Sequence, residues 1–223
     1  MTFWAFGDSF MAYDANYIRT LANSCNADNV QTLGVNGTGL LFTYQMLLQY
    51  KDKIQDDDVV LIGLSSTARH IFDHDWHVTF GGLDRRLAVS DDQYKAGQLY
   101  FKHLYNDTHA SNLAHAILSS IFHSIIPSIK SQRVSAIITT DLDGYTNRYN
   151  IPDYLFTDNT LFNIVKTYLI DKRQYDSNDL DTIMKQLNGK NHWLTYDDYS
   201  KYFFSKIERV LDDLQINKIT NFI

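Results

Sequence analysis

The chain has 223 residues, of which 44% are hydrophobic and 21% charged, so it can bury one sizeable core and is not intrinsically disordered. The formal net charge is −6 and no run of Lys and Arg exceeds two residues, which argues against nucleic acid as the main partner. A single cysteine, Cys25, excludes an internal disulfide framework. No apolar stretch reaches the roughly 18 residues of a membrane span, and residues 1–6 lack the features of a secretory signal, so we expect no membrane partner.

Short apolar runs predict four β-strands, at residues 2–6, 30–35, 59–64 and 134–139. These runs alternate little between apolar and polar positions, which is typical of parallel strands buried on both faces. Helical patterns fill the gaps, at residues 14–23, 40–50 and about 98–129. The resulting β-α-β-α-β order predicts one α/β domain over residues 1–223, with a doubly wound parallel sheet.

The remainder of the chain is less regular. Residues 141–190 are polar, and helices are expected near residues 161–170 and 179–187, with a fifth strand concealed in the same segment. A last helix is clearer, because Thr195 can cap its start with Asp198 as the acid of a capping box. One apolar face then follows, formed by Phe203, Ile207, Val210, Leu211 and Leu214.

Small and polar residues follow the expected strands. In open parallel sheets, ligands bind beyond the carboxyl ends of the strands, where the strand order reverses. The segments at those ends are Gly-Asp-Ser-Phe at residues 7–10, Gly-Val-Asn-Gly-Thr-Gly at 34–39 and Gly-Leu-Ser-Ser at 63–66. Asn-His-Trp at residues 191–193 precedes the last helix. We expect these segments to meet at one edge of the sheet.

Together these segments carry a family resemblance. Residues 7–10 resemble the nucleophile block of the SGNH hydrolases, also called the GDSL esterase/lipase superfamily. Asn36-Gly37 resembles the second block of that family, and His-Trp-Leu-Thr at residues 192–195 resembles the block around its catalytic histidine. The likeness runs in the family's order from residue 7 to about residue 205. It implies a flavodoxin-like, three-layer α/β/α fold and hydrolysis of acyl esters without a metal or cofactor.

The resemblance also implies roles for single residues. Ser9 would be the nucleophile and His192 the base that takes its proton, since a serine hydroxyl needs a base within hydrogen-bond reach. The backbone N–H groups of Ser9 and Gly37 would donate hydrogen bonds to the oxyanion. An isolated Gly-Asp-Ser can equally be a turn that caps a helix, and His192 can equally lie at a helix entrance without a catalytic role.

Two positions depart from the family's pattern. The third block usually supplies an Asn side chain to the oxyanion hole, whereas this chain has Ser65 in that position. The family also places an Asp three residues before its histidine, and this chain has Gly189 there, with Asn188 as the nearest residue able to orient His192. The loss of one oxyanion donor typically costs about 10²–10³ in rate.

Further residues are expected to line the substrate site, namely Asp8, Asn36, Ser66, Arg69 and Trp193. For Asp8 the alternative is a purely structural role, in which its side chain shapes the turn by hydrogen bonds. Arg69 either binds an anionic or sugar group or pairs with an acid. The pair Ser65-Ser66 with the following Arg69 resembles variants in viral members of the family.

Two competing motifs are weaker. Residues 34–39 are rich in glycine, but they lack the Gly-x-Gly-x-x-Gly spacing and the Walker lysine of nucleotide-binding loops. His70, His74 and His77 would share one face of a helix, as a metal site requires. However, Trp76, Val78 and Phe80 indicate that this segment is extended, so no metal site is expected.

The sequence therefore predicts a serine ester hydrolase that acts through an acyl-enzyme. The resemblance implies an O-acylated, in particular an O-acetylated, carbohydrate or a similar small-molecule ester as substrate. The alternative is a member of the same fold that has lost catalysis and serves as a glycan-binding or structural module. The expected location is the cytoplasm or a virion.

Overall fold

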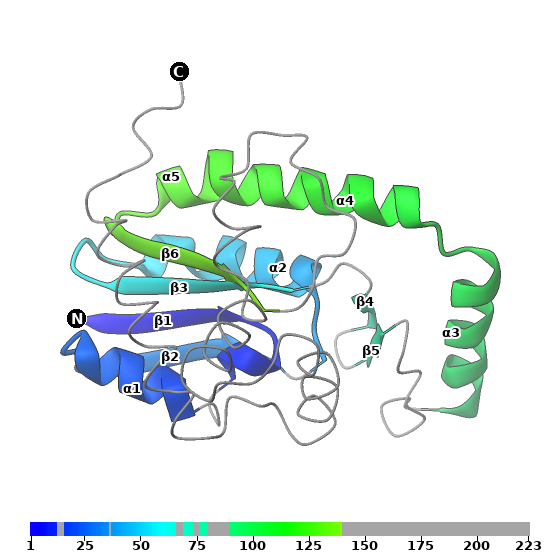
Figure 1. Ribbon diagram of the computed structural model, residues 1–223, viewed down its shortest axis with the longest axis horizontal. Coiled ribbons are helices and arrows are strands. Elements are labelled where there is room, and N and C mark those ends of the chain that lie inside the picture. Colours follow the sequence, from blue (N-terminus) through cyan, green and yellow to red (C-terminus); the bar gives the residue numbers. More distant parts are fainter. Residues whose placement is uncertain (13–15, 36, 66–68, 74–75, 80–89, 140–223) are drawn as a thin grey trace, which may run out of the picture.

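A parallel sheet of four strands forms the centre of the computed structural model, which describes residues 1–12, 16–35, 37–65, 69–73, 76–79 and 90–139 (Figure 1). Its strands are β1 (Thr2–Gly7), β2 (Asn29–Gly34), β3 (Val59–Leu64) and β6 (Arg133–Ile138). They lie side by side in the order β2-β1-β3-β6, and each neighbouring pair is parallel. The α/β class expected from the sequence is therefore confirmed.

All four strands expected from the sequence are present, with bounds that differ by at most one residue. All six residues of β3 are buried, because β3 has a strand on each side and apolar side chains on both faces. Such a strand must be apolar throughout, so it reads as a continuous apolar run. In β2, the outermost described strand on its side of the sheet, the same alternation of faces leaves Asn29 and Gln31 exposed.

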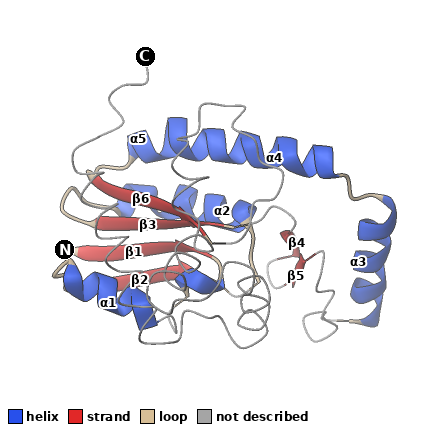
Figure 2. Cartoon of the chain, viewed as in Figure 1, coloured by secondary structure: helices blue, strands red, loops and turns tan. Residues whose placement is uncertain are grey.

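Two helices connect the first three strands (Figure 2). Helix α1 (Asn16–Ser24) lies against β2. Beyond its end, Asn26 has a φ of 56°, which lets the N–H of Ala27 bond to the carbonyl of Ala22 at 2.9 Å. Helix α2 (Leu40–Tyr50) has the bounds expected from the sequence and continues into the short helix η2 (Lys51–Lys53). Helix α2 packs on β1 and β3.

The single helix expected over residues 98–129 is wrong. The chain instead forms α3 (Asp91–His103), then α4 (Asp107–Ser120), a π-helical turn η4 (Ile121–Ile125) and α5 (Ile126–Ser128). The helical pattern is interrupted because the Asn106 side chain accepts a hydrogen bond from the N–H of His109 at 3.1 Å and caps α4. The side chain of Ser90 caps α3 in the same way. Helices α3 and α4 run in clearly different directions in Figure 1.

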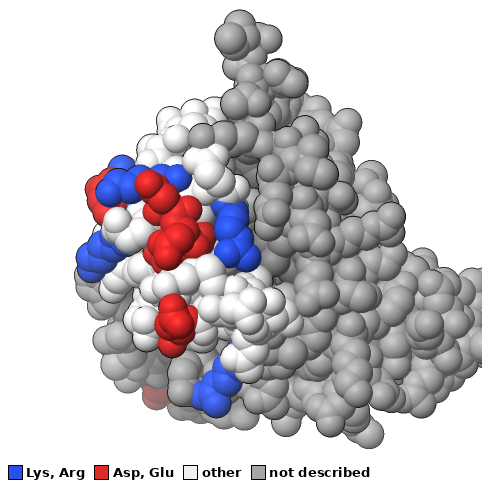
Figure 3. Space-filling model, turned by 90° about the vertical axis from the view of Figure 1, so that its left-hand side faces the viewer, with Lys and Arg blue, Asp and Glu red and all other residues white. Residues whose placement is uncertain are grey.

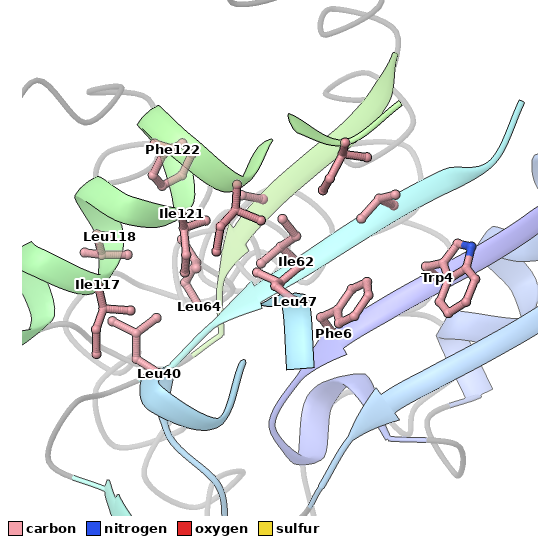
Figure 4. Close-up of a cluster of buried hydrophobic side chains, with 14 of the residues drawn as sticks. Trp4, Phe6, Leu40, Leu47, Ile62, Leu64, Ile117, Leu118, Ile121 and Phe122 are labelled. Carbon is pink, nitrogen blue, oxygen red and sulfur yellow. The ribbon is translucent and has the colours of Figure 1, made fainter. Parts of the chain in front are cut away.

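The hydrophobic core lies between the sheet and the helices α2, α4 and η4 (Figure 4). Trp4 and Phe6 point from β1 into it, and their rings stack with centroids 6.2 Å apart. Burial of one such large apolar side chain contributes about 1.5–3 kcal/mol. The other buried members are Leu40, Leu47, Ile54, Val60, Ile62, Leu64, Ala114, Ile117, Leu118, Ile121, Phe122, Ile125, Ile129 and Ala136.

A small antiparallel pair, β4 (Arg69–Asp73) and β5 (Trp76–Thr79), lies beyond the carboxyl ends of the large sheet. The extended conformation expected around Trp76 is thus confirmed. His70 and His77 occupy facing strands and do not share a helix face. The helices expected at 161–170 and 179–187, the fifth strand and the helix after Thr195 lie outside the described residues.

The described residues bear on two of the expected absences, a membrane span and a basic face. None of the helices that the structure describes is long and apolar enough to cross a membrane. Figure 3 shows the end of the molecule at the amino ends of the strands, where acidic and basic side chains are interspersed. On the described part of this face there is no extended patch of Lys and Arg.

Candidate active site

The carboxyl end of β1 is the point where the strand order reverses. After β1 the chain places β2 on one side, and then β3 and β6 on the other. Open α/β sheets bind their ligands at such a point. Gly7 is the last residue of β1, and Asp8 and Ser9 follow it directly.

Ser9 begins a tight turn, the 3-10 helix η1 (Ser9–Met11). Asp8 shapes this turn, because its carboxylate accepts a hydrogen bond from the N–H of Phe10 at 3.0 Å. The carbonyl of Asp8 accepts a second one from the N–H of Met11 at 2.9 Å. Asp8 is fully buried, whereas Ser9 keeps 9% of its surface exposed. The turn role that the sequence offered for Asp8 is therefore confirmed.

Thr139, directly after β6, joins the turn to the rest of the sheet. Its N–H donates to the carbonyl of Leu64 at 2.9 Å, which anchors it at the end of β3. Its hydroxyl lies 3.2 Å from Oδ2 of Asp8 and 3.3 Å from the carbonyl oxygen of Leu64. A hydroxyl has one hydrogen to donate. The carboxylate is the stronger acceptor, so we assign the donation to Asp8.

Sequence reasoning treated Thr139 only as the end of a strand and missed its place in the site. The polarity of Thr139, together with its position after a strand, could have indicated it. Thr139 is a buried polar residue directly after the carboxyl end of a parallel strand. Such a residue needs a hydrogen-bond partner, and the loops at the same edge of the sheet are the nearest source of one.

The loop after β2 is bound to the end of β1. The N–H of Val35 donates to the carbonyl of Gly7 at 3.4 Å. The buried hydroxyl of Thr38 lies 2.7 Å from the carbonyl oxygen of Val35 and 3.3 Å from that of Gly7. Gly37, between them, has a φ of 82°, a conformation that favours glycine. The Gly37 loop is thus held beside the strand that leads to Ser9.

Ser65, the residue after β3, connects the third loop to the second. It is fully buried, and its hydroxyl donates to the carbonyl of Thr38 at 3.5 Å. The loops after β1, β2 and β3 are therefore joined through Thr38. The oxyanion role expected for Ser65 stays a prediction.

The N–H groups of Ser9 and Gly37 are the backbone donors of interest at this edge. Ser9 is the first residue of η1, so its N–H has no acceptor inside that turn. Within the described part of the chain, neither this N–H nor that of Gly37 bonds to another backbone group. Both donors are therefore suited to binding an oxygen that carries negative charge.

The structure brings together four of the residues selected from the sequence, Asp8, Ser9, Gly37 and Ser65, on loops at one edge of the sheet. Arg69 begins β4. The other selected residues, Asn36, Ser66, Asn188, His192 and Trp193, lie outside the described residues. Among the residues that are described, no group of three or more His, Cys, Asp or Glu could hold a metal ion.

Comparison with known proteins returns no relative. No family model matches the chain, and no curated protein and no solved structure matches it either.

Proposed function

We propose that this chain is a serine ester hydrolase related to the SGNH hydrolases. The observation that carries the proposal is the position of Ser9. It follows the strand at which the strand order reverses, on a turn held by a buried aspartate. The loop that contains Gly37 is bonded to the end of the same strand. A nucleophile and two oxyanion donors at one edge form the core of an acyl-transfer site.

We further propose the flavodoxin-like, three-layer arrangement that the resemblance implies. The order β2-β1-β3-β6 supports it, because flavodoxin-like sheets begin in the order 2-1-3-4. Burial on both faces of β1 supports it as well. Trp4 and Phe6 belong to the core under α2 and α4, while Phe3 and Ala5, which point to the opposite face, are also fully buried.

The proposed reaction has two steps. The Ser9 hydroxyl attacks the acyl carbon while His192 takes its proton, and the tetrahedral oxyanion accepts hydrogen bonds from the N–H groups of Ser9 and Gly37. His192 then returns the proton to the departing alcohol oxygen as its bond to the acyl carbon breaks. Water hydrolyses the acyl-Ser9 ester by the same route. Asn188 orients His192 in this scheme.

The proposed substrate is an O-acylated carbohydrate, in particular an O-acetylated one, or a similar small ester. This choice rests on the substrates that are common in the family that the chain resembles. Asn36, Ser66, Arg69 and Trp193 are proposed to contact the alcohol part of the ester. Asp8 is fully buried in the turn, so we propose that it holds the turn that carries Ser9 and does not contact the substrate.

The alternative is a glycan-binding or structural module, for example in a virion, that keeps this fold without catalysis. One observation favours it. The Ser65 hydroxyl occupies the position of the family's third oxyanion donor, but it is buried and bonded to Thr38. An enzyme with this arrangement would stabilise the oxyanion with two backbone donors alone.

The test is hydrolysis of p-nitrophenyl acetate, together with labelling by a fluorophosphonate probe. The wild type is compared with Ser9→Ala and His192→Ala, and with Ser24→Ala as a control at an exposed serine. We expect Ser9→Ala to abolish labelling and to lower kcat by about 10⁴-fold or more. Ser24→Ala should behave as the wild type. If the wild type is not labelled and hydrolyses the ester no faster than Ser9→Ala does, the proposed esterase activity is contradicted. The glycan-binding or structural module is then favoured.

For the substrate, the readout is acetate released from an acetylated polysaccharide. Release that depends on Ser9 supports the carbohydrate ester. A labelled wild type that hydrolyses p-nitrophenyl acetate but releases no acetate would keep the esterase and exclude this substrate class.

A further inference from the structure

Three glycines form a row across the carboxyl ends of three neighbouring strands. Gly34 ends β2 and is paired with Gly7 at the end of β1. On the other side of β1, Phe6 is paired with Ile62, so Gly63 of β3 lies next to Gly7. Met11, which is fully buried, lies on this row, with its side chain over Gly7 and Gly63 and its main chain over Gly34.

The contacts between Met11 and the row leave no room for a side chain at any of the three glycines. A Cβ atom built on Gly7 would lie 2.6 Å from Cγ of Met11, and one built on Gly63 would lie 2.7 Å from the same atom. A Cβ atom on Gly34 would lie 2.4 Å from the carbonyl carbon of Met11. Carbon atoms that are not bonded to each other do not approach so closely. The row is thus a seat shaped for Met11.

Met11 is also the last residue of the turn that begins with Ser9. Its N–H bonds to the carbonyl of Asp8 at 2.9 Å, so the seat, the turn and the nucleophile form one short rigid unit. The unbranched methionine side chain suits a narrow slot of this kind. Because Ser9 and Met11 belong to the same three-residue turn, a displacement of Met11 would also move the Ser9 hydroxyl.

We propose that Met11 is a positioning residue for Ser9, and that its side chain, seated on Gly7 and Gly63 while its main chain lies against Gly34, fixes the place of the Ser9 hydroxyl at the edge of the sheet. The inference rests on the proposed function, and it adds the device that holds the nucleophile in place. Met11 itself touches no reacting atom in this scheme. Its effect is therefore expected on kcat and not on KM.

The first test compares Met11→Ala and Met11→Leu with the wild type. A displacement of about 1 Å at a catalytic group can cost about 10²-fold in rate, so Met11→Ala should lower kcat and the labelling rate by about 10–100-fold. Its KM should change by less than about threefold, as expected when only transition-state interactions are lost. Met11→Leu refills most of the slot and should restore most of the rate.

A matched control is Met46→Ala. Met46 lies on α2 and packs against the hydrophobic core, outside the turn. This variant removes a methionine side chain of the same size, so it should lower Tm without a selective loss of kcat. An equal loss of kcat in Met46→Ala and Met11→Ala would overturn the proposal, because it would reduce the effect of Met11 to general stability.

A second test uses the glycines and needs no catalysis. The Gly63→Ala methyl collides with the Met11 side chain, so Met11→Ala should remove the collision, and the double variant should have a higher Tm than Gly63→Ala alone. Gly34→Ala collides with main-chain atoms, with the Met11 carbonyl carbon at 2.4 Å and the Asp8 carbonyl oxygen at 2.6 Å. Met11→Ala should therefore give no rescue of Gly34→Ala. If the changes in Tm were additive for Met11→Ala combined with Gly63→Ala as well as with Gly34→Ala, the proposed contact between the Met11 side chain and the glycines would be wrong.

Hydrogen exchange separates the failure of this inference from failure of the proposed function. If Met11 holds the turn, the amides of Phe10 and Met11 should exchange faster in Met11→Ala, by more than the amides of β1 do. If the wild type shows neither hydrolysis nor labelling, the proposed esterase activity is contradicted. Amide hydrogen exchange and the Tm values of the glycine double variants then still test whether Met11 holds the turn. Unchanged exchange at Phe10 and Met11 would overturn the inference even in an active enzyme.

Discussion

Two buried aspartates lie at opposite ends of the same sheet, and they serve different purposes. Asp58 precedes β3 at the amino end of the sheet and is almost fully buried. Its carboxylate accepts three hydrogen bonds, from Thr2 N at 2.6 Å, Trp4 Nε1 at 2.9 Å and Gln55 N at 2.9 Å. Its own carbonyl accepts a fourth from the hydroxyl of Ser131 at 2.5 Å.

These contacts determine the ionisation of Asp58. Burial is the largest single influence and opposes the charged form. The hydrogen bonds from Gln55, Trp4 and Thr2, with the positive charge of the N-terminal amino group, outweigh it, so the pKa of the Asp58 carboxyl lies below its ordinary value. The amino end of the sheet is therefore a closed junction in which the carboxylate stabilises the fold.

At the carboxyl end, Asp8 is equally buried, but it supports a turn in which the next residue, Ser9, keeps 9% of its surface exposed. Asp8 binds the N–H of Phe10 and the hydroxyl of Thr139, and the N–H groups of Ser9 and Gly37 bond to no other backbone group in the described part of the chain. Burial of an aspartate thus does not by itself indicate a functional site. The distinguishing feature is the set of open donors beside it.

Replacement of Asp58 by Ala should have the largest effect on stability. It leaves three donors without their acceptor, and each buried donor in that state costs about 1–3 kcal/mol. Because water can reach part of the space, we expect the free energy of unfolding to fall by about 2–4 kcal/mol in urea denaturation. The labelling rate of the folded protein should stay unchanged, since Asp58 lies at the end of the sheet away from Ser9.

The control is Asp57→Ala, at a neighbouring carboxylate that is 70% exposed. An exposed carboxylate contributes little, so its loss should change the free energy of unfolding by less than about 0.5 kcal/mol. A loss in Asp58→Ala no larger than that in Asp57→Ala would remove the distinction between the two ends of the sheet.

A smaller effect is expected from pH. The folded pKa of Asp58 is lowered, so its contribution is present above the unfolded pKa, near about 4, and is lost as pH falls through the folded pKa. Asp58→Asn keeps the shape but cannot ionise. We expect it to be less stable than the wild type by about 1–2 kcal/mol at pH 7, and by less at about pH 2.

The measurement is urea denaturation of the wild type and Asp58→Asn at a series of pH values. The two curves of unfolding free energy against pH should converge toward acid. A separation that stays constant from neutral to acid pH would show that the charge of Asp58 contributes nothing, and that only its shape matters.

The sheet could be predicted from the sequence because parallel strands buried on both faces are short, apolar and separated by helical patterns. Residues 59–64 show this most clearly, since every side chain of β3 is buried. The break between α3 and α4 could not be predicted in the same way. Apolar positions continue at helical intervals through it, whereas in the structure α3 ends at His103 and the Asn106 side chain caps the start of α4 by accepting from the N–H of His109.

The site could be predicted only in part. Ser9 and Gly37 stand in short motifs directly after strands, so position in the sequence alone indicates them. Thr139 and Met11 carry no such motif. Thr139 lies 131 residues from Asp8 along the chain, and Met11 contacts glycines in three different strands. Both roles depend on the arrangement of the strands in the sheet, which no local pattern in the sequence indicates.

A further prediction tests whether Asp8 needs Thr139. Thr139→Val keeps the shape of the side chain but removes the hydroxyl that lies 3.2 Å from Asp8. Loss of one hydrogen bond to a charged group costs about 1.5–3 kcal/mol, but Asp8 keeps its bond to Phe10, so we expect the low end of that range in urea denaturation. The turn should remain, and labelling of Ser9 should slow by about 3–10-fold, less than in Met11→Ala.

Thr139→Ser is the matched control, because it keeps the hydroxyl and loses the methyl group. If the hydrogen bond matters, Ser should preserve the labelling rate and Val should not. If the methyl group matters, the reverse holds, since Cγ2 of Thr139 also lies near Gly63 under Met11. A slower rate in Val alone would mean that the buried aspartate at the carboxyl end of the sheet positions the nucleophile through its hydrogen bonds. A slower rate in Ser alone would assign that task to packing on the glycine row, as in the proposal for Met11.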